Sequence, residues 1–184
     1  MILNKSKVFI ISIFLIVSGK TSTTNLTSSI SLDSLEYKKL ELVHHVDAHV
    51  NNLDMSHSIV DNALKHNIDI CFMLAQSKIE TNYGKSGIGK RKNSIFGIVS
   101  KSYNDFTESI KDYCEMLTRN YLVNGKTEQH LLLDFVNKHG DRYAESREYE
   151  MHLCSEYNKI RSSSKIHKLQ NDIILEKSSR SDKR

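Results

Sequence analysis

Apolar residues recur at helical spacing along most of this chain, and no segment shows the apolar–polar alternation of a half-buried strand. The clearest stripe begins after Asp105, which precedes Glu108 by three residues in a capping-box pattern. Its apolar positions are Phe106, Ile110, Tyr113, Cys114, Leu117 and Tyr121. This periodicity predicts a mainly α-helical protein.

The same periodicity, with its start and stop residues, predicts six further helices. They are expected at about 35–51, 55–66, 69–80, 127–140, 146–160 and 165–177. A chain of 184 residues is long enough for one compact domain with a sizeable core. We expect that domain to occupy residues 34–160, with 161–184 as a basic C-terminal helix or tail.

Residues 1–19 have the pattern of an export signal. Lys5 and Lys7 precede an apolar run from Val8 to Val17, and the small residues Ser18-Gly19 follow, as at a signal-peptide cleavage site. The run is short for a membrane span, which needs about 20 residues. Cleavage near Gly19 is expected, with retention as an uncleaved membrane anchor as the alternative. Residues 20–33 are rich in serine and threonine and read as a linker.

Charge is concentrated at the C-terminus. Residues 159–184 hold eight basic and three acidic side chains, a net charge of +5, whereas the whole chain carries +4. The remainder is therefore close to −1, which does not suit a dedicated nucleic-acid binder. A solvated, frayed terminus is the expected state of this segment, and contact with anionic wall polymers or lipid headgroups is the alternative.

Cysteine and histidine patterns give no metal centre. Cys71, Cys114 and Cys154 each fall within a predicted helix, so buried thiols are expected rather than a disulfide framework or a zinc site. His45 and His49 have the i, i+4 spacing of two metal ligands, but no metalloenzyme motif accompanies them. We expect surface histidines and neither a metal nor another cofactor.

The turn over residues 84–91 nearly matches the phosphate-binding GxxxxGK[ST] pattern. Arg91 occupies the position of the magnesium-binding hydroxyl, and a helix rather than a strand precedes the turn. Nucleotide binding is therefore not expected. The cations of this turn either contact carboxylates of a substrate or stabilise an exposed loop.

Glu80 is the strongest candidate for chemistry. In the third predicted helix Ile70, Met73, Leu74 and Ser77 share one face, and Glu80 falls at the edge of that face. A partly desolvated carboxyl has a raised pKa, as a general acid at neutral pH requires. Spacing alone equally fits a solvated glutamate at a helix end.

Four ordered blocks across residues 55–160 carry a resemblance to a known family. The blocks are Ala75-Gln76-x-x-x-Glu80-Thr81-Asn82-Tyr83-Gly84-Lys85-Ser86, Asn93-Ser94-Ile95-Phe96-Gly97-Ile98, Tyr103-x-x-Phe106-x-x-Ser109-Ile110-x-x-Tyr113, and Tyr143-Ala144-x-x-x-x-Tyr149. Together they resemble the glucosaminidase domain of glycoside hydrolase family 73. The resemblance implies a lysozyme-like fold and cleavage of the β-1,4 bond between N-acetylglucosamine and N-acetylmuramic acid in peptidoglycan.

The resemblance also implies roles for individual residues. Glu80 matches the catalytic acid, and Tyr143 matches a tyrosine that lines the cleft near the scissile bond. The expected substrate-binding residues are Gln76, Tyr83, Asn93, Phe96, Gly97 and Tyr103. Among them Tyr83 stands at the family's tryptophan position and is expected to stack on a sugar ring.

One departure from the family concerns a β-hairpin that brings a second carboxylate. Only Val99-Ser100-Lys101-Ser102 fills that gap here, so we expect a reduced or absent hairpin. The substrate's own 2-acetamido group then assists Glu80, or else Asp105 or Glu108 activates a water. We favour a single-glutamate mechanism.

The predicted function is an exported, monomeric peptidoglycan hydrolase in wall remodelling or phage lysis, located in the periplasm, the cell wall or the medium. A lytic transglycosylase and a non-catalytic peptidoglycan-binding or assembly protein are the alternatives.

Overall fold

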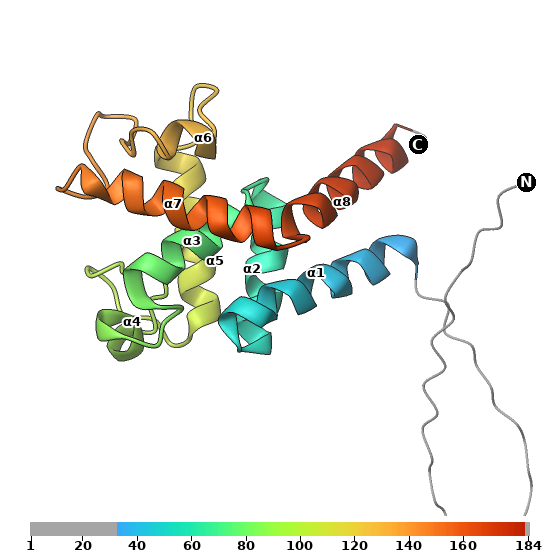
Figure 1. Cartoon of the computed structure of the whole chain (residues 1–184), viewed down its shortest axis with the longest axis horizontal. Helices are drawn as coiled ribbons and strands as arrows, with labels where there is room; N and C mark the ends of the chain where they lie inside the picture. Colours follow the sequence, from blue (N-terminus) through green and yellow to red (C-terminus); the bar gives the residue numbers. More distant parts are fainter. Residues whose placement is uncertain (1–32, 183–184) are drawn as a thin grey trace, which may run out of the picture.

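The computed structural model describes residues 33–182, which form eight helices and no sheet (Figure 1). The helices are α1 (Ser34–Val50), α2 (Leu53–His66), α3 (Ile70–Thr81), α4 (Gly87–Lys92), α5 (Phe106–Asn120), α6 (Glu128–Leu131), α7 (Glu148–Ser163) and α8 (Ile166–Ser181). The prediction of a mainly helical fold is confirmed. Between α4 and α5 the chain forms no strand, so the hairpin is absent as expected.

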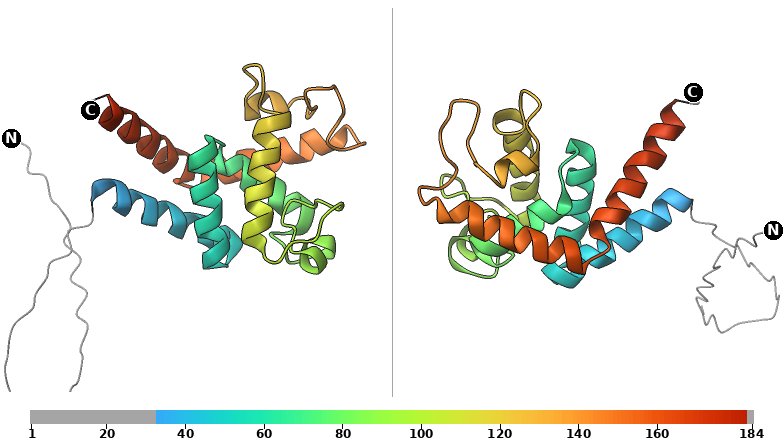
Figure 2. Two further views of the ribbon diagram at one scale, coloured as in Figure 1. Left: turned by 180° about the vertical axis from the view of Figure 1, so that it is seen from behind. Right: turned by 45° about the horizontal axis from the view of Figure 1, so that its top comes forward.

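Helix α3 is the centre of the fold. It contacts α2, α4, α7 and α8, and lies among the other helices in both views of Figure 2. Every residue from Ile70 to Ser77 is buried. The buried surface of α3 is therefore wider than the single face that its apolar spacing marks in the sequence. Cys71 and Phe72, which lie off the predicted face, are also fully buried. Only the last turn of α3 reaches the surface, and Glu80 lies in that turn.

Asparagine ends the first four helices. Asn51, Asn67, Asn82 and Asn93 follow α1 to α4, and each adopts the left-handed backbone conformation with φ between 49° and 55°. Among non-glycine residues asparagine tolerates this conformation best. The chain thus stops its helices without proline and with few glycines.

The residue before α3 and a side chain from α8 fix the start of this helix. The Asp69 carboxylate accepts the Cys71 N–H at 2.8 Å as a cap. Gln170 of α8 accepts the Ile70 N–H at 3.0 Å and donates to the Ile68 carbonyl at 2.7 Å. Both bonds are buried, so α8 belongs to the packed body around α3.

The C-terminal segment differs from the frayed terminus that its charge suggests. Helix α8 packs along α1, and Figures 1 and 2 show the pair extending together from the rest of the molecule. Lys38 bonds to Glu176 at 2.8 Å, and Arg180 forms a two-pronged pair with Asp33. The expectation of a frayed terminus is wrong for residues 166–181.

The helix predicted over residues 127–140 is also wrong beyond Leu131, where α6 ends. The following segment folds back on itself, with a single bridge between Val136 and Arg142. The side chain of Asn137 accepts the N–H groups of His139 and Asp141, at 2.8 and 3.0 Å. Such local bonds compete with helix formation. The segment over 84–91, predicted as a turn, contains most of the short helix α4.

Cys71 and Cys114 are buried free thiols, as predicted, and Cys154 is a half-buried one. None of the helices in residues 33–182 is long and apolar enough to cross a membrane. The export signal and most of the linker that the sequence predicts lie outside the described residues.

Candidate functional site

Glu80 lies in the last turn of α3 with its carboxylate half-buried. Oε1 accepts a hydrogen bond from the hydroxyl of Tyr149 at 2.6 Å. Burial raises the pKa of Glu80 above its ordinary value, and the bond from Tyr149 lowers it by a smaller amount. No residue in the described part of the chain forms a salt bridge with Glu80, including the cations of α4.

Gly97 lies against the other carboxylate oxygen. Its φ is +69°, and a Cβ placed on it would lie 2.6 Å from Oε2 of Glu80. Glycine is therefore favoured here for two reasons, its backbone conformation and the close approach of the carboxylate. Any larger residue would displace the carboxylate.

The segment before Gly97 is tied to the end of α3. The Thr81 hydroxyl donates to the Ile95 carbonyl at 2.6 Å, and the Ser94 hydroxyl accepts the Ile98 N–H at 2.9 Å. The ring of Phe96 stacks on Tyr113 with centroids 3.6 Å apart. These contacts hold Gly97 beside Glu80.

Tyr143 and Tyr149 form an aromatic wall next to the carboxylate. The Tyr143 hydroxyl donates to the Phe96 carbonyl at 2.9 Å, and its ring stacks on Phe135 at 4.5 Å. The ring centroids of Tyr143 and Tyr149 are 5.5 Å apart. Burial raises the pKa of both phenols above the normal range, so they remain hydrogen-bond donors at neutral pH.

Tyr149 was not among the site residues predicted from the sequence. It occurs in the fourth motif block, but its contact with Glu80 joins α7 to α3 and depends on the fold. The motif block was the only signal in the sequence, and it did not indicate a partner.

Several predicted substrate-binding residues are buried rather than exposed to a cleft. Gln76 is fully buried, its oxygen accepts the Tyr113 hydroxyl, and its Nε2 has no partner among the described residues. Tyr83 is 6% exposed and Phe96 1% exposed. Such side chains offer a sugar ring almost no surface, which differs from the stacking expected of Tyr83.

Asn93 and Tyr103 form the base of the loop that leads into α5. The Asn93 amide donates to the carbonyls of Tyr103 and Asn104, each at 3.0 Å, and the Tyr103 hydroxyl donates to Asp112 at 2.7 Å. Tyr103 is 8% exposed. Both residues therefore shape the loop. Of the predicted site residues, Gly97 lies against Glu80, and Tyr143 reaches the site through its neighbour Tyr149 in the aromatic wall.

The two candidates for a second carboxylate have other partners. Asp105 accepts the Glu108 N–H at 2.8 Å as the N-cap of α5. Glu108 accepts both the backbone and the side-chain N–H groups of Asn104, at 2.9 and 3.0 Å. Each carboxylate thus stabilises the start of α5, and neither bonds to Glu80, Tyr143 or Tyr149.

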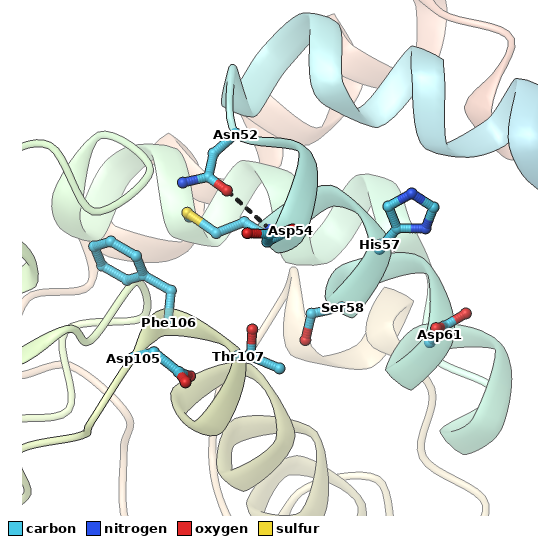
Figure 3. A pocket seen from close by; sticks show the side chains of 9 residues that line it. Asn52, Asp54, His57, Ser58, Asp61, Asp105, Phe106 and Thr107 are labelled. Atoms are coloured by element: carbon cyan, nitrogen blue, oxygen red, sulfur yellow. Dashed lines mark hydrogen bonds between the residues drawn. The ribbon is translucent and has the colours of Figure 1, made fainter. Parts of the chain in front are cut away.

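An open pocket of about 530 Å³ lies between α2 and the start of α5 (Figure 3). It is lined by Asn52, Asp54, Met55, His57, Ser58, Asp61, Asp105, Phe106 and Thr107. Asn52 and Asp105 cap helices there, and Asp61 pairs with Lys39 at 2.7 Å. Glu80 and the two tyrosines do not line this pocket, so it is separate from the carboxylate site.

The histidines of α1 have ordinary surroundings among the described residues. His45 lies 4.0 Å from Glu41, and burial lowers the pKa of His49. Within residues 33–182 no group of three or more His, Cys, Asp and Glu side chains is arranged to hold a metal ion.

Comparison with known proteins agrees with the motif blocks. A family model described as mannosyl-glycoprotein endo-beta-N-acetylglucosaminidase, the Glucosaminidase family, matches residues 56–162. Two curated proteins of Streptococcus pneumoniae, from strains TIGR4 and R6, are each 31% identical over 71 residues. Both carry the name "Putative endo-beta-N-acetylglucosaminidase".

The region matched to these relatives covers 34% of this chain, and 11% and 10% of the two relatives. The relatives are therefore much longer proteins, and the likeness concerns one part of each. The family model itself matches more than half of this chain and includes α3, α5, α7 and the loop with Gly97. The chain belongs to the glucosaminidase family, the domain of glycoside hydrolase family 73.

Proposed function

We propose that this protein is an exported peptidoglycan hydrolase that cleaves the β-1,4 bond between N-acetylglucosamine and N-acetylmuramic acid. Membership of the glucosaminidase family supports the reaction class. The observation that carries the proposal is the setting of Glu80, a half-buried carboxyl with a raised pKa and no salt-bridge partner among the described residues. A carboxyl in this state at the surface end of a buried helix has the properties of a general acid.

In this mechanism Glu80 protonates the glycosidic oxygen as the oxocarbenium-like transition state forms. Tyr149 binds Oε1 and so fixes the plane of the carboxyl group. Oε2, next to the Cα of Gly97, is then the atom that carries the proton to the substrate. Tyr143, the second tyrosine of the wall, is proposed to line the cleft beside the scissile bond.

Glu80 acts as the only carboxylate in this proposal. Asp105 and Glu108 are engaged at the start of α5, so the 2-acetamido group of the substrate assists at the anomeric carbon. At the other glycosidic bond, whose anomeric carbon belongs to N-acetylmuramic acid, attack by the 6-hydroxyl of that sugar instead of water would give a lytic transglycosylase, which also needs one glutamate.

The remaining predicted residues are proposed to act through the walls of the site. The buried side chains of Gln76, Phe96 and Tyr83 support Glu80 and Gly97 from the protein interior. Asn93 and Tyr103 hold the adjoining loop. A protein acting on peptidoglycan works outside the cytoplasm, which agrees with the signal pattern of residues 1–19. We propose that it acts as a monomer.

Release of soluble fragments from purified peptidoglycan tests the proposal. We expect wild-type protein to release reducing ends and Glu80→Gln to lose about a thousandfold of this activity. Glu115→Gln, an exposed change on α5, is the matched control and should retain activity. Fragment release by Glu80→Gln at the wild-type rate would remove Glu80 from the mechanism.

A non-catalytic wall-binding protein is the second candidate, and the absent hairpin between α4 and α5 favours it. In that case wild-type protein would sediment with insoluble peptidoglycan and release nothing. Binding without release would therefore replace the first proposal with the second.

A further inference from the structure

An ion pair joins the chain neighbours of the two site tyrosines. Arg142 immediately precedes Tyr143, and Glu150 immediately follows Tyr149. Nη2 of Arg142 donates to Oε1 of Glu150 at 2.6 Å. Glu150 is 6% exposed, whereas the Arg142 side chain is 26% exposed, so a buried carboxylate pairs with a partly exposed guanidinium. The pair links the loop that carries Tyr143 to the helix that carries Tyr149.

The same carboxylate oxygen also holds the third ring of the aromatic wall. Oε1 of Glu150 accepts the N–H of Phe135 at 3.1 Å. The Phe135 carbonyl in turn accepts the N–H of Tyr143 at 2.8 Å, and the two rings stack within 12° of parallel. Glu150 thus lies where the backbone of the loop meets α7.

Arg142 suits this position because a guanidinium can donate in three directions at once. Besides Glu150 it donates from Nη1 to Asp134 at 3.1 Å and from Nε to the Ala144 carbonyl at 3.2 Å. The Asp134 side chain is 62% exposed, whereas that of Glu150 is 7% exposed. A lysine has a single ammonium group and cannot reproduce this planar set of bonds.

We propose that the Arg142–Glu150 ion pair is a positioning device, which fixes the hydroxyl of Tyr149 on Glu80 and that of Tyr143 on the Phe96 carbonyl. The inference rests on the proposed function in one respect, that Glu80 is the acid being positioned. Arg142 and Glu150 act through the tyrosines and have no contact with Glu80 in the structure. Removing either charge breaks this link between the loop and α7, so we expect the two segments to move relative to each other.

Titration of the Glu80 carboxyl by carbon-13 NMR measures the pKa of Glu80, which reports whether Tyr149 is bonded to it. The measurement does not require turnover. Loss of the Tyr149 bond removes the one interaction that lowers the pKa of Glu80, so that pKa must rise. The other titratable groups that respond to the charge of Glu80 are Tyr113, Tyr143 and Tyr149, and burial raises the pKa of all three. Glu80 therefore titrates before any of them.

The informative variant is Glu150→Gln, which keeps an oxygen for the Phe135 N–H and removes the charge. We expect an upward shift of the Glu80 pKa, smaller than the shift in Tyr149→Phe, together with about a tenfold loss of kcat and a smaller change in KM. Asp134→Asn is the matched control because it removes the exposed partner of Arg142 and leaves Glu150 in place. It should change neither quantity.

A double variant separates positioning from general damage. If Glu150 acts through Tyr149, adding Glu150→Gln to Tyr149→Phe shifts the pKa no further. An equal shift in both backgrounds, or no shift in Glu150→Gln alone, would overturn the inference. Arg142→Lys provides the same comparison if Glu150→Gln does not fold. Absence of turnover in the wild type would instead count against the proposed function and leave the titration readable.

Discussion

The hydroxyl of Tyr149 lies 2.6 Å from Oε1 of Glu80, although the two residues are 69 positions apart in the chain. On the opposite side of the carboxylate, Oε2 lies against the backbone of Gly97. The carboxyl group is thus held between α7 and the loop after α4. Its reactivity depends on the packing of three separate segments and not on the motif around Glu80 alone.

Removing the phenol in Tyr149→Phe should move the alkaline limb of the pH–rate profile to higher pH. The hydrogen bond favours the ionised carboxylate, so its loss raises the pKa of Glu80. A general acid is active while protonated, and activity then persists to higher pH. At the optimum we expect about a tenfold lower kcat because the carboxyl is less well oriented. A limb that stays in place or moves to lower pH in kcat/KM measurements would contradict this assignment.

Substitution of Gly97 by alanine should damage activity more than stability. The left-handed backbone costs about 1–2 kcal/mol for a residue with a Cβ, and the new methyl group would displace the Glu80 carboxylate. We expect about a hundredfold loss of kcat/KM. Gly125→Ala is the matched control because Gly125 also has a positive φ, +77°, with nothing within 4 Å of its Cβ position. Equal activity losses in the two variants would show that the contact with Glu80 is unimportant.

The Glu80→Gln variant should be more stable than the wild type at neutral pH. The pKa of Glu80 is raised in the folded state, so the folded protein binds this proton more tightly than the unfolded chain does. The stabilisation of the fold by the protonated carboxyl is therefore complete below pH 4.5, the ordinary pKa of a glutamate. It is lost as the pH rises through the higher pKa of the folded state. Urea unfolding at pH 7 and at pH 4 measures the difference. The advantage of the variant should be confined to the higher pH, and a variant less stable at pH 7 would contradict the burial of the charge.

Helix α8 should be required for the stability of α3, even though the family match ends at residue 162. Gln170→Leu leaves the Ile70 N–H and the Ile68 carbonyl buried without partners. We expect a loss of about 2–4 kcal/mol in the free energy of unfolding. Asn171→Ala, an exposed change in the next position, should cost less than about 0.5 kcal/mol. Similar urea midpoints for the two variants would contradict this role of α8.

Local sequence patterns predicted where the helices lie better than they predicted which surfaces of those helices are buried. The stripe from Phe106 to Tyr121 matches α5 closely because that helix has one buried and one exposed face. Helix α3 has no exposed face over most of its length, so its periodicity carried little information about its neighbours. The segment after Leu131 contains helix-forming apolar residues, but Phe135 is buried by partners from α7 and α3 that a local pattern does not contain.

The site could be predicted in part. The motif blocks predicted Glu80 and Gly97 as site residues, and the structure places these two residues against each other. They did not distinguish residues that face the site from residues that support it, because both kinds belong to the same motif. Gln76 and Tyr113 belong to the same buried network, whereas Tyr149 contacts the carboxylate. Only the packing of α7 against α3 separates these roles.

Mass spectrometry of the fragments released from peptidoglycan tests the central claim most directly. If Glu80 catalyses hydrolysis of the bond after N-acetylglucosamine, wild-type protein releases fragments that end in reducing N-acetylglucosamine, and Glu80→Gln releases none above background. Fragments ending in reducing N-acetylmuramic acid would assign cleavage to the other bond, and anhydro-muramic ends would assign a transglycosylase. Either product, or no product from the wild type, would contradict the proposed reaction.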